Sequence, residues 1–207
     1  MMRRGRLITI EGLDGAGKTT LAHSLRDELA GRHVDVQLLR EPGGVQAAER
    51  IRELVKDPQM QVGARAEALL YAAARAQLVQ EAVKPLLRDG RWVLLDRFVD
   101  SSLAYQGAGR DLGMSAVRRI NEFATGHLMP DRTLLLIVEP ELGMSRSSAR
   151  EQPPDRLEQE DDSFRARISE AYVELAESEP DRIRVIDGSL EPAEVVAAAL
   201  EALADLI

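Results

Sequence analysis

The sequence predicts an α/β domain in which a parallel β-sheet is covered by helices on both faces. Short, nearly continuous apolar runs alternate along the chain with longer segments whose apolar residues recur three and four positions apart. Parallel neighbours need helical crossovers and bury both faces of the sheet, so their strands are apolar throughout. At 207 residues the chain has the length of one such domain, which we expect to cover residues 1–207.

Five apolar runs are expected to form the strands, and six amphipathic segments the helices. The expected strands are Leu7–Ile10, Val34–Leu39, Trp92–Leu95, Thr133–Val138 and Ile183–Ile186. The expected helices are Thr19–Ala30, Ala47–Val55, Ala64–Leu87, Ser115–Ala124, Glu160–Ala176 and Pro192–Leu206. Residues 146–160 are rich in Arg, Ser, Pro and acids, which is typical of a mobile lid rather than a packed element.

Composition and charge argue against several classes of partner and site. With 27 Lys+Arg against 35 Asp+Glu, the net charge is −8, so no diffuse basic field attracts a nucleic acid polymer or an anionic membrane. The sequence has no cysteine and only three histidines, which argues against disulfides, thiol nucleophiles and Cys-based metal sites. The apolar stretch Leu7–Ile10 is too short for a signal peptide or a membrane span. We therefore expect a cytoplasmic protein.

A phosphate-binding motif joins the first expected strand to the first expected helix. Gly12-Leu13-Asp14-Gly15-Ala16-Gly17-Lys18-Thr19 matches the Walker A pattern at every fixed position, so the fold is expected to be a P-loop NTPase fold. Glycines allow successive N–H groups to face one anion, and the helix adds its positive end. Lys18 is expected to contact the β and γ phosphates, and Thr19 to bind Mg²⁺. The expected ATP site is Gly12, Leu13, Asp14, Gly15, Ala16, Gly17, Lys18, Thr19 and Thr20.

A second polar pair, Asp96-Arg97, ends the third expected strand. Open α/β sheets bind ligands at the carboxyl ends of their strands. Asp96 is suited to holding Mg²⁺ through water, and Arg97 to gripping the acceptor phosphate with two N–H groups. Taken alone, such a pair is more often a local salt bridge. Beside a Walker A motif, a second phosphate site is the better interpretation.

The order of these motifs resembles the thymidylate kinase family from Leu7 to about Ile186. The resemblance is carried by Glu11–Thr20, by Arg40-Glu41-Pro42-Gly43-Gly44, by the Asp96-Arg97-Phe98 segment leading to Tyr105-Gln106-Gly107, and by the Arg-rich lid. The Walker A part is shared by many NTPases, whereas Arg-Glu-Pro-Gly-Gly is more specific. The resemblance implies transfer of the γ-phosphoryl group of ATP to dTMP, giving dTDP and ADP for dTTP biosynthesis. It further implies Mg²⁺ and a homodimer formed through helices.

The resemblance also implies a dTMP site. Asp14 is expected to contact the sugar 3′-hydroxyl, and Tyr71 to stack on thymine in place of the usual Phe, although its hydroxyl needs a partner if buried. Ser102 helps to read the base, and Tyr105 crowds the sugar 2′ position. Each of these has a plainer alternative, such as a loop acid, a helix cap or core packing. The remaining expected residues are Arg75, which hydrogen-bonds the thymine carbonyl, Pro42, which follows a cis peptide, Arg97 and Gln106.

The lid offers the third cation of the expected catalytic set. Arg146, Arg150 and Arg156 are candidates for neutralising the phosphoryl group in flight. The P-loop carries Ala16 where some relatives have a basic residue, so the resemblance implies that the lid supplies the catalytic cation. We expect this to be Arg150, alongside Lys18 and Arg97, with Arg146 in the ATP site. A solvated charge run is the alternative.

Two residues depart from the family pattern. Ile137 stands where an Asp is common, and Val45 where a Thr follows Gly44. Three other functions also remain open from sequence: another nucleoside monophosphate or deoxynucleoside kinase, a regulatory P-loop switch, and a degenerate binding module. The sequence has no Asn-Lys-x-Asp guanine motif, which argues against a GTPase switch.

Overall fold

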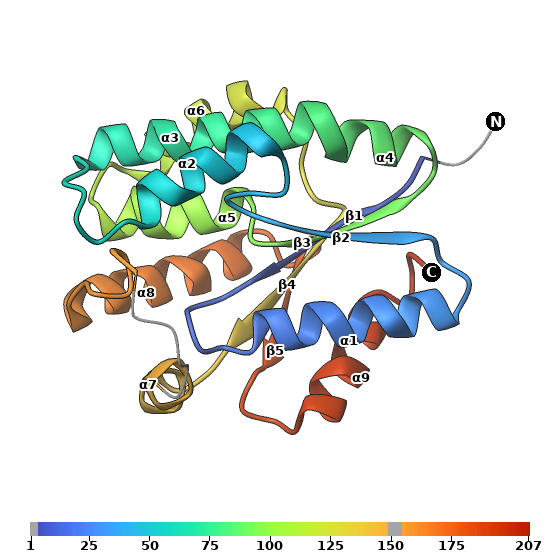
Figure 1. The fold of residues 1–207 in the computed structure, drawn as a ribbon. Helices are drawn as coiled ribbons and strands as arrows, with labels where there is room; N and C mark the ends of the chain where they lie inside the picture. The colour runs from blue at the N-terminus through green and yellow to red at the C-terminus, as the bar shows by residue number, and fades with distance from the viewer. Residues whose placement is uncertain (1–3, 149–154) are drawn as a thin grey trace.

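The computed structural model describes residues 4–148 and 155–207 and contains the expected five-stranded parallel sheet (Figure 1). Its strand order is β2-β3-β1-β4-β5, and each neighbouring pair is parallel. Every expected strand is present, with ends shifted by at most two residues. The strands are β1 (Leu7–Glu11), β2 (Val36–Arg40), β3 (Trp92–Asp96), β4 (Arg132–Ile137) and β5 (Ile183–Asp187).

The expected helices are also present, and the structure adds three short ones. The long helix expected over residues 64–87 is interrupted by a π-helical turn. Residues 99–109 and 140–148 are also helical, outside the six ranges expected. The helices are α1 (Lys18–Gly31), α2 (Gln46–Lys56), α3 (Ala64–Leu78), η1 (Val79–Val83), α4 (Lys84–Arg88), α5 (Val99–Ser102), η2 (Leu103–Gly109), α6 (Met114–Thr125), α7 (Pro140–Ser148), α8 (Asp162–Ser178) and α9 (Pro192–Ala202).

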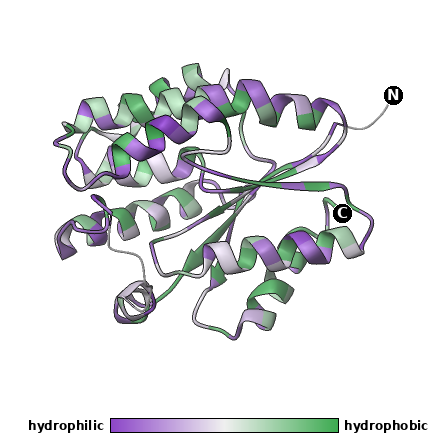
Figure 2. Cartoon of the chain, in the orientation of Figure 1, coloured by the Kyte–Doolittle hydropathy of each residue, from purple (hydrophilic) through white to green (hydrophobic). Residues whose placement is uncertain are grey.

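Alternation along the buried strands supplies two hydrophobic cores, one on each face of the sheet. In β1, Leu7 joins the core beneath α3, η2 and α8, whereas Ile8 and Ile10 join the core beneath α1 and α9. Figure 2 shows the hydrophobic character of the central strands that lie between these two layers. The fold class predicted from sequence is confirmed. No helix in the described ranges is long and apolar enough to cross a membrane.

The expected lid begins inside a helix and ends in a turn. Arg146 lies in α7, which continues to Ser148. The expected catalytic Arg150 falls outside the described residues. Asp155 is the first described residue after residue 148. It accepts hydrogen bonds from the backbone N–H groups of Leu157 and Glu158 at 2.9 and 3.1 Å, which stabilises a compact turn before α8.

Candidate active site

The P-loop connects β1 to α1 and curls because its glycines adopt conformations that other residues avoid. Gly12, Gly15 and Gly17 have φ of 138°, 82° and 92°. A Cβ on Gly15 would lie 2.0 Å from the backbone oxygen of Gly143 in α7, so this close approach also requires glycine. The Gly17 side of the loop leads into α1, whose N-terminal N–H groups favour an anion.

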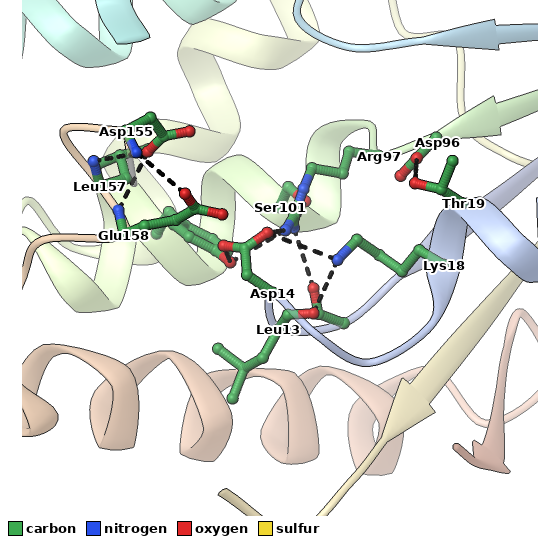
Figure 3. A network of polar contacts seen from close by, with 12 residues as sticks. Leu13, Asp14, Lys18, Thr19, Asp96, Arg97, Ser101, Asp155, Leu157 and Glu158 are labelled. Atoms are coloured by element: carbon green, nitrogen blue, oxygen red, sulfur yellow. Dashed lines mark hydrogen bonds and ion pairs between the residues drawn. The ribbon is translucent and has the colours of Figure 1, made fainter. Parts of the chain in front are cut away.

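Three charged side chains converge beside this loop (Figure 3). Arg97 Nη2 donates to Asp14 Oδ1 at 2.7 Å, and the Lys18 ammonium lies 3.8 Å from the same oxygen. Lys18 Nζ also donates to the backbone oxygen of Leu13 at 2.7 Å. Arg97 has a left-handed φ of 71° and donates to Gly12 O at 3.0 Å, which ties the end of β3 to the P-loop. The expected donor and acceptor cations therefore meet at one carboxylate.

Burial and neighbouring charge shift the pKa values of both Lys18 and Asp14 in this cluster. Burial, with the charge of Arg97 adding to it, lowers the pKa of Lys18 to about 8. Burial alone would raise the pKa of Asp14, but the charges of Arg97 and Lys18 outweigh it and hold that pKa well below its usual range. Asp14 is thus ionised, and its single negative charge offsets part of the positive charge of Lys18 and Arg97. A bound polyphosphate, which carries more negative charge, would offset more of it.

Two hard oxygen groups lie side by side where a magnesium ion is expected. Thr19 Oγ1 donates to Asp96 Oδ2 at 2.9 Å (Figure 3). The described residues contain no cluster of three or more His, Cys, Asp or Glu able to hold a metal alone. One hydroxyl and one carboxylate fit Mg²⁺, because this ion keeps several waters and takes further oxygens from phosphates.

A cavity of about 2050 Å³ is lined by the P-loop and by Tyr71 in the middle of α3. This exceeds the roughly 300–1,000 Å³ typical of a site for one small ligand, so the cavity has room for two nucleotides. Among the expected residues, most line the cavity: Leu13, Asp14, Gly17, Lys18, Thr19, Thr20, Pro42, Tyr71, Asp96, Arg97, Ser102, Tyr105 and Gln106. Gly12, Gly15, Ala16, Arg75 and Arg146 are described but do not line it.

Aromatic and polar groups from α3, α5 and η2 also line this cavity. The Tyr105 hydroxyl donates to Asp14 Oδ2 at 3.1 Å, and its ring lies 5.0 Å from the Arg97 guanidinium. Tyr71 is half-buried, and its hydroxyl has no hydrogen-bond partner among the described residues. The peptide between Glu41 and Pro42 is cis, as the family resemblance implies.

Arg75 lies behind this wall rather than in it. Its side chain is 2% exposed and forms an ion pair with Glu41 at 2.7 Å. It also donates to Ser102 Oγ at 2.9 Å, to Phe98 O at 2.8 Å and to Asn121 Oδ1. Ser102 faces the cavity, so Arg75 adjoins the expected base site through this serine. A direct contact with thymine stays a prediction.

Sequence reasoning assigned no role to Glu11, yet it supports the Arg97 loop. This fully buried carboxylate accepts hydrogen bonds from the Phe98 N–H at 2.7 Å, from Ser101 and from the Tyr172 hydroxyl at 3.1 Å. Burial, together with the charge of Asp100, raises the pKa of Glu11 to about 7. The sequence feature that could have identified Glu11 is its position at the end of β1, directly before the Walker A motif.

Arg52 is a further cavity residue that the sequence did not single out. It extends from α2, lines the cavity and donates to Pro42 O at 2.8 Å. Helical periodicity indicates only that this side chain is polar, because nothing in the sequence places α2 across from Tyr71. It adds a cation beside the expected acceptor end.

The two described lid arginines occupy different places. Arg146 donates to Gly188 O at 2.7 Å, beside the P-loop backbone at Ala16. Arg156 lies against α2 and α3, where its Nη2 is 2.6 Å from the buried carboxylate of Glu67. Arg156 is thus held against α2 and α3, and of these two arginines only Arg146 lies beside the P-loop.

Comparisons with known proteins agree with this geometry. The family model described as thymidylate kinase matches residues 10–199. The chain belongs to the thymidylate kinase family. It is therefore an ATP-dependent phosphotransferase, with a P-loop fold that the resemblance predicted correctly.

Relatives of this family match almost end to end. The chain is 45% identical to the thymidylate kinase of Lactobacillus delbrueckii subsp. bulgaricus over 96% of this chain and 95% of that protein. It is 46% identical to the thymidylate kinase of Deinococcus radiodurans, covering 91% of each. The crystal structure of thymidylate kinase from Ehrlichia chaffeensis superposes with a TM-score of 0.78 at 28% identity, covering 97% of this chain and 99% of that one. The comparisons give no support to a different acceptor, a switch or a degenerate module.

Proposed function

We propose that ATP and dTMP occupy the two ends of the cavity and that the γ-phosphoryl group passes between them beside Arg97. A phosphate oxygen of dTMP attacks the γ phosphorus, the bond to the ADP oxygen breaks, and dTDP and ADP result. The acceptor oxygen is already anionic, so no general base is needed. The observation that carries this proposal is the convergence of Lys18 and Arg97 on Asp14, between the P-loop and the Tyr71 end of the cavity.

The donor half holds the ATP phosphates. The P-loop N–H groups and Lys18 bind them, and Lys18 exchanges its bond to Leu13 O for a phosphate oxygen. Thr19 and Asp96 would hold Mg²⁺, Asp96 through water. When bound, this ion neutralises charge that develops on the β and γ phosphates.

The acceptor half holds dTMP by its phosphate, sugar and base. Arg97 turns from Asp14 to the dTMP phosphate, and Asp14 becomes free to accept a hydrogen bond from the 3′-hydroxyl. Tyr71 stacks on thymine. Its hydroxyl needs no protein partner there, because the residue is only half-buried and the hydroxyl can bind water. Ser102 and Gln106 supply polar contacts to the nucleotide, Arg75 orients Ser102, and Tyr105 leaves little room for a 2′-hydroxyl.

The lid supplies the remaining cation and excludes water. We assign this role to Arg150, with Arg146 on the ATP side. Replacing Lys18 or Arg150 by Ala should slow turnover roughly 10³–10⁵-fold, the effect of losing a principal phosphate-stabilising cation. If Arg150→Ala kept near-full turnover, the assignment of Arg150 would be wrong.

We further propose that two copies associate through the layer that contains α3 and α6. Phe123 on α6 is 90% exposed and Leu69 on α3 is 57% exposed, and such large apolar side chains together mark an interaction surface. This layer lies on the side of the sheet away from α1 and α9 (Figure 1). The cytoplasmic location stays a prediction from the sequence.

Separate KM values for the two substrates test the division of the cavity. Arg97→Met should raise the KM for dTMP much more than the KM for ATP, and Lys18→Met should do the reverse. Steady-state assays that vary one substrate at a time measure both. Equal effects of each variant on both substrates would contradict the division.

A further inference from the structure

Glu67 in α3 is a buried carboxylate that the mechanism above does not use. Its side chain is fully buried, yet it lies 2.6 Å from Arg156 Nη2 and 3.1 Å from Arg110 Nη2. It also accepts a hydrogen bond from Gln106 Nε2 at 2.9 Å. Two guanidinium groups compensate the buried negative charge, so the carboxylate can serve as a fixed acceptor.

This carboxylate decides which end of the Gln106 amide faces the ligand. An ionised carboxylate only accepts hydrogen bonds, so the Gln106 nitrogen must point to Glu67 and its carbonyl oxygen the other way. Gln106 lines the cavity, and no donor to its Oε1 is found in the described parts of the chain. Tyr71, one helical turn after Glu67, lines the same cavity. The oxygen of Gln106 is thus the atom left to accept a hydrogen bond from a nucleotide.

We infer that Glu67 is a positioning residue for the acceptor site, which presents the Gln106 carbonyl oxygen to an N–H or O–H of the monophosphate. The inference rests on the proposed placement of dTMP. Without the carboxylate, the amide is free to turn its N–H groups to the ligand, where they repel a donor. Glu67 acts through Gln106 and touches neither substrate.

The test is the effect of Glu67→Gln on each substrate separately. The variant keeps the shape of the side chain and removes its charge. The KM for dTMP should rise up to about tenfold, the effect of losing roughly one hydrogen bond between Gln106 and the nucleotide, while the KM for ATP stays within about twofold. Asp205→Asn is the matched control, because it removes the carboxylate partner of the largely buried Arg132 without lining the cavity. The control should leave both KM values unchanged.

A second variant separates positioning from a general loss of folding. Glu67→Asp keeps the charge beside both arginines but withdraws the carboxylate from Gln106. We expect it to fold and still to raise the KM for dTMP. If the KM values for ATP and dTMP rose together in either Glu67 variant, or neither rose, the inference would be overturned.

Gln106→Met distinguishes failure of the inference from failure of the dTMP placement. The Glu67→Gln change should have little further effect on the KM for dTMP when Gln106 is already Met, because both act through one bond. If Gln106→Met raises this KM and Glu67→Gln acts with full strength on top of it, the positioning role is wrong and the placement stands. If Gln106→Met leaves the KM unchanged, the placement of dTMP beside Gln106 is wrong as well.

Discussion

Lys18 and Arg97 form a compact charge arrangement around the Asp14 carboxylate. The Asp14 carboxylate holds both cations in place in the free protein. When nucleotides bind, Lys18 and Arg97 must exchange their contacts with Asp14 for contacts with phosphate oxygens. Lys18 in particular is nearly buried and has a pKa lowered to about 8. Its charge therefore responds to pH near neutrality.

Nucleotide binding should be accompanied by proton uptake at Lys18. The free enzyme at pH 8 has this amine about half neutral, whereas a bound triphosphate favours the charged form and raises its pKa. We expect an uptake of about half a proton at pH 8, which falls toward pH 6.5. Calorimetric titration with a non-hydrolysable ATP analogue and Mg²⁺, repeated in buffers of different ionisation enthalpy, measures it.

The control for this titration is the Lys18→Met variant at raised analogue concentration. It should bind weakly and take up no proton at pH 8. An uptake of the same size in the variant would assign the proton to another group, and no uptake in either protein would contradict the lowered pKa.

The sequence predicted these residues because motifs place them at fixed offsets from strand ends. It did not predict the roles of Glu11 and Arg52, whose side chains matter through partners far away in the chain. Glu11 contacts Phe98 and Tyr172, 87 and 161 positions away. Such pairings depend on tertiary packing, which periodicity cannot supply.

At the scale of elements, all strands and all six expected helices were predictable, whereas the bounds of the short helices beside the site were not. Residues 99–109 form α5 and η2 without the apolar repeat of an isolated helix, because nearly every residue there is buried on all sides. The last three residues of α7, 146–148, were assigned to the lid, and the rest of the helix was not expected because its sequence gives no apolar stripe. Elements stabilised by their surroundings in this way contribute residues to the cavity wall.

The packing of α7 against the P-loop gives a prediction about this pair of elements. In Gly15→Ala, the new methyl group would meet the backbone oxygen of Gly143 and the residue would keep a φ of 82°. The loop must shift, so the KM for ATP should rise at least about tenfold, equivalent to roughly 1.4 kcal/mol of strain. Steady-state kinetics at saturating dTMP measures the change.

Gly63→Ala is the matched control for this substitution. Gly63 precedes α3 with a negative φ, and no atom lies within 4 Å of an added Cβ. It should leave the KM for ATP unchanged. A Gly15→Ala enzyme with unaltered ATP kinetics would show that the P-loop does not depend on its contact with α7.

At the scale of the whole molecule, the exposed apolar residues of the α3 and α6 layer predict a dimer. Phe123→Lys should shift the protein to a monomer, because a charge at the centre of an apolar contact costs several kcal/mol once buried. Analytical ultracentrifugation over a range of concentrations measures the shift. Val185→Lys is the control, since it alters an exposed apolar residue on β5 at a distant edge of the sheet.

A Phe123→Lys protein with the sedimentation behaviour of the wild type would contradict the proposed interface. A monomeric wild type would remove the homodimer from the account.

The central claim is that this kinase transfers phosphate to dTMP, and its acceptor dependence tests that most directly. ADP release from ATP and Mg²⁺ would be measured with dTMP, dUMP, dGMP, dAMP, dCMP, UMP or no acceptor. We predict strong stimulation by dTMP, formation of dTDP, and little response to the others. Stimulation by a different nucleotide with none by dTMP would contradict the acceptor site built from Tyr71, Ser102, Tyr105 and Gln106, and ADP release without any acceptor dependence would contradict the kinase mechanism itself.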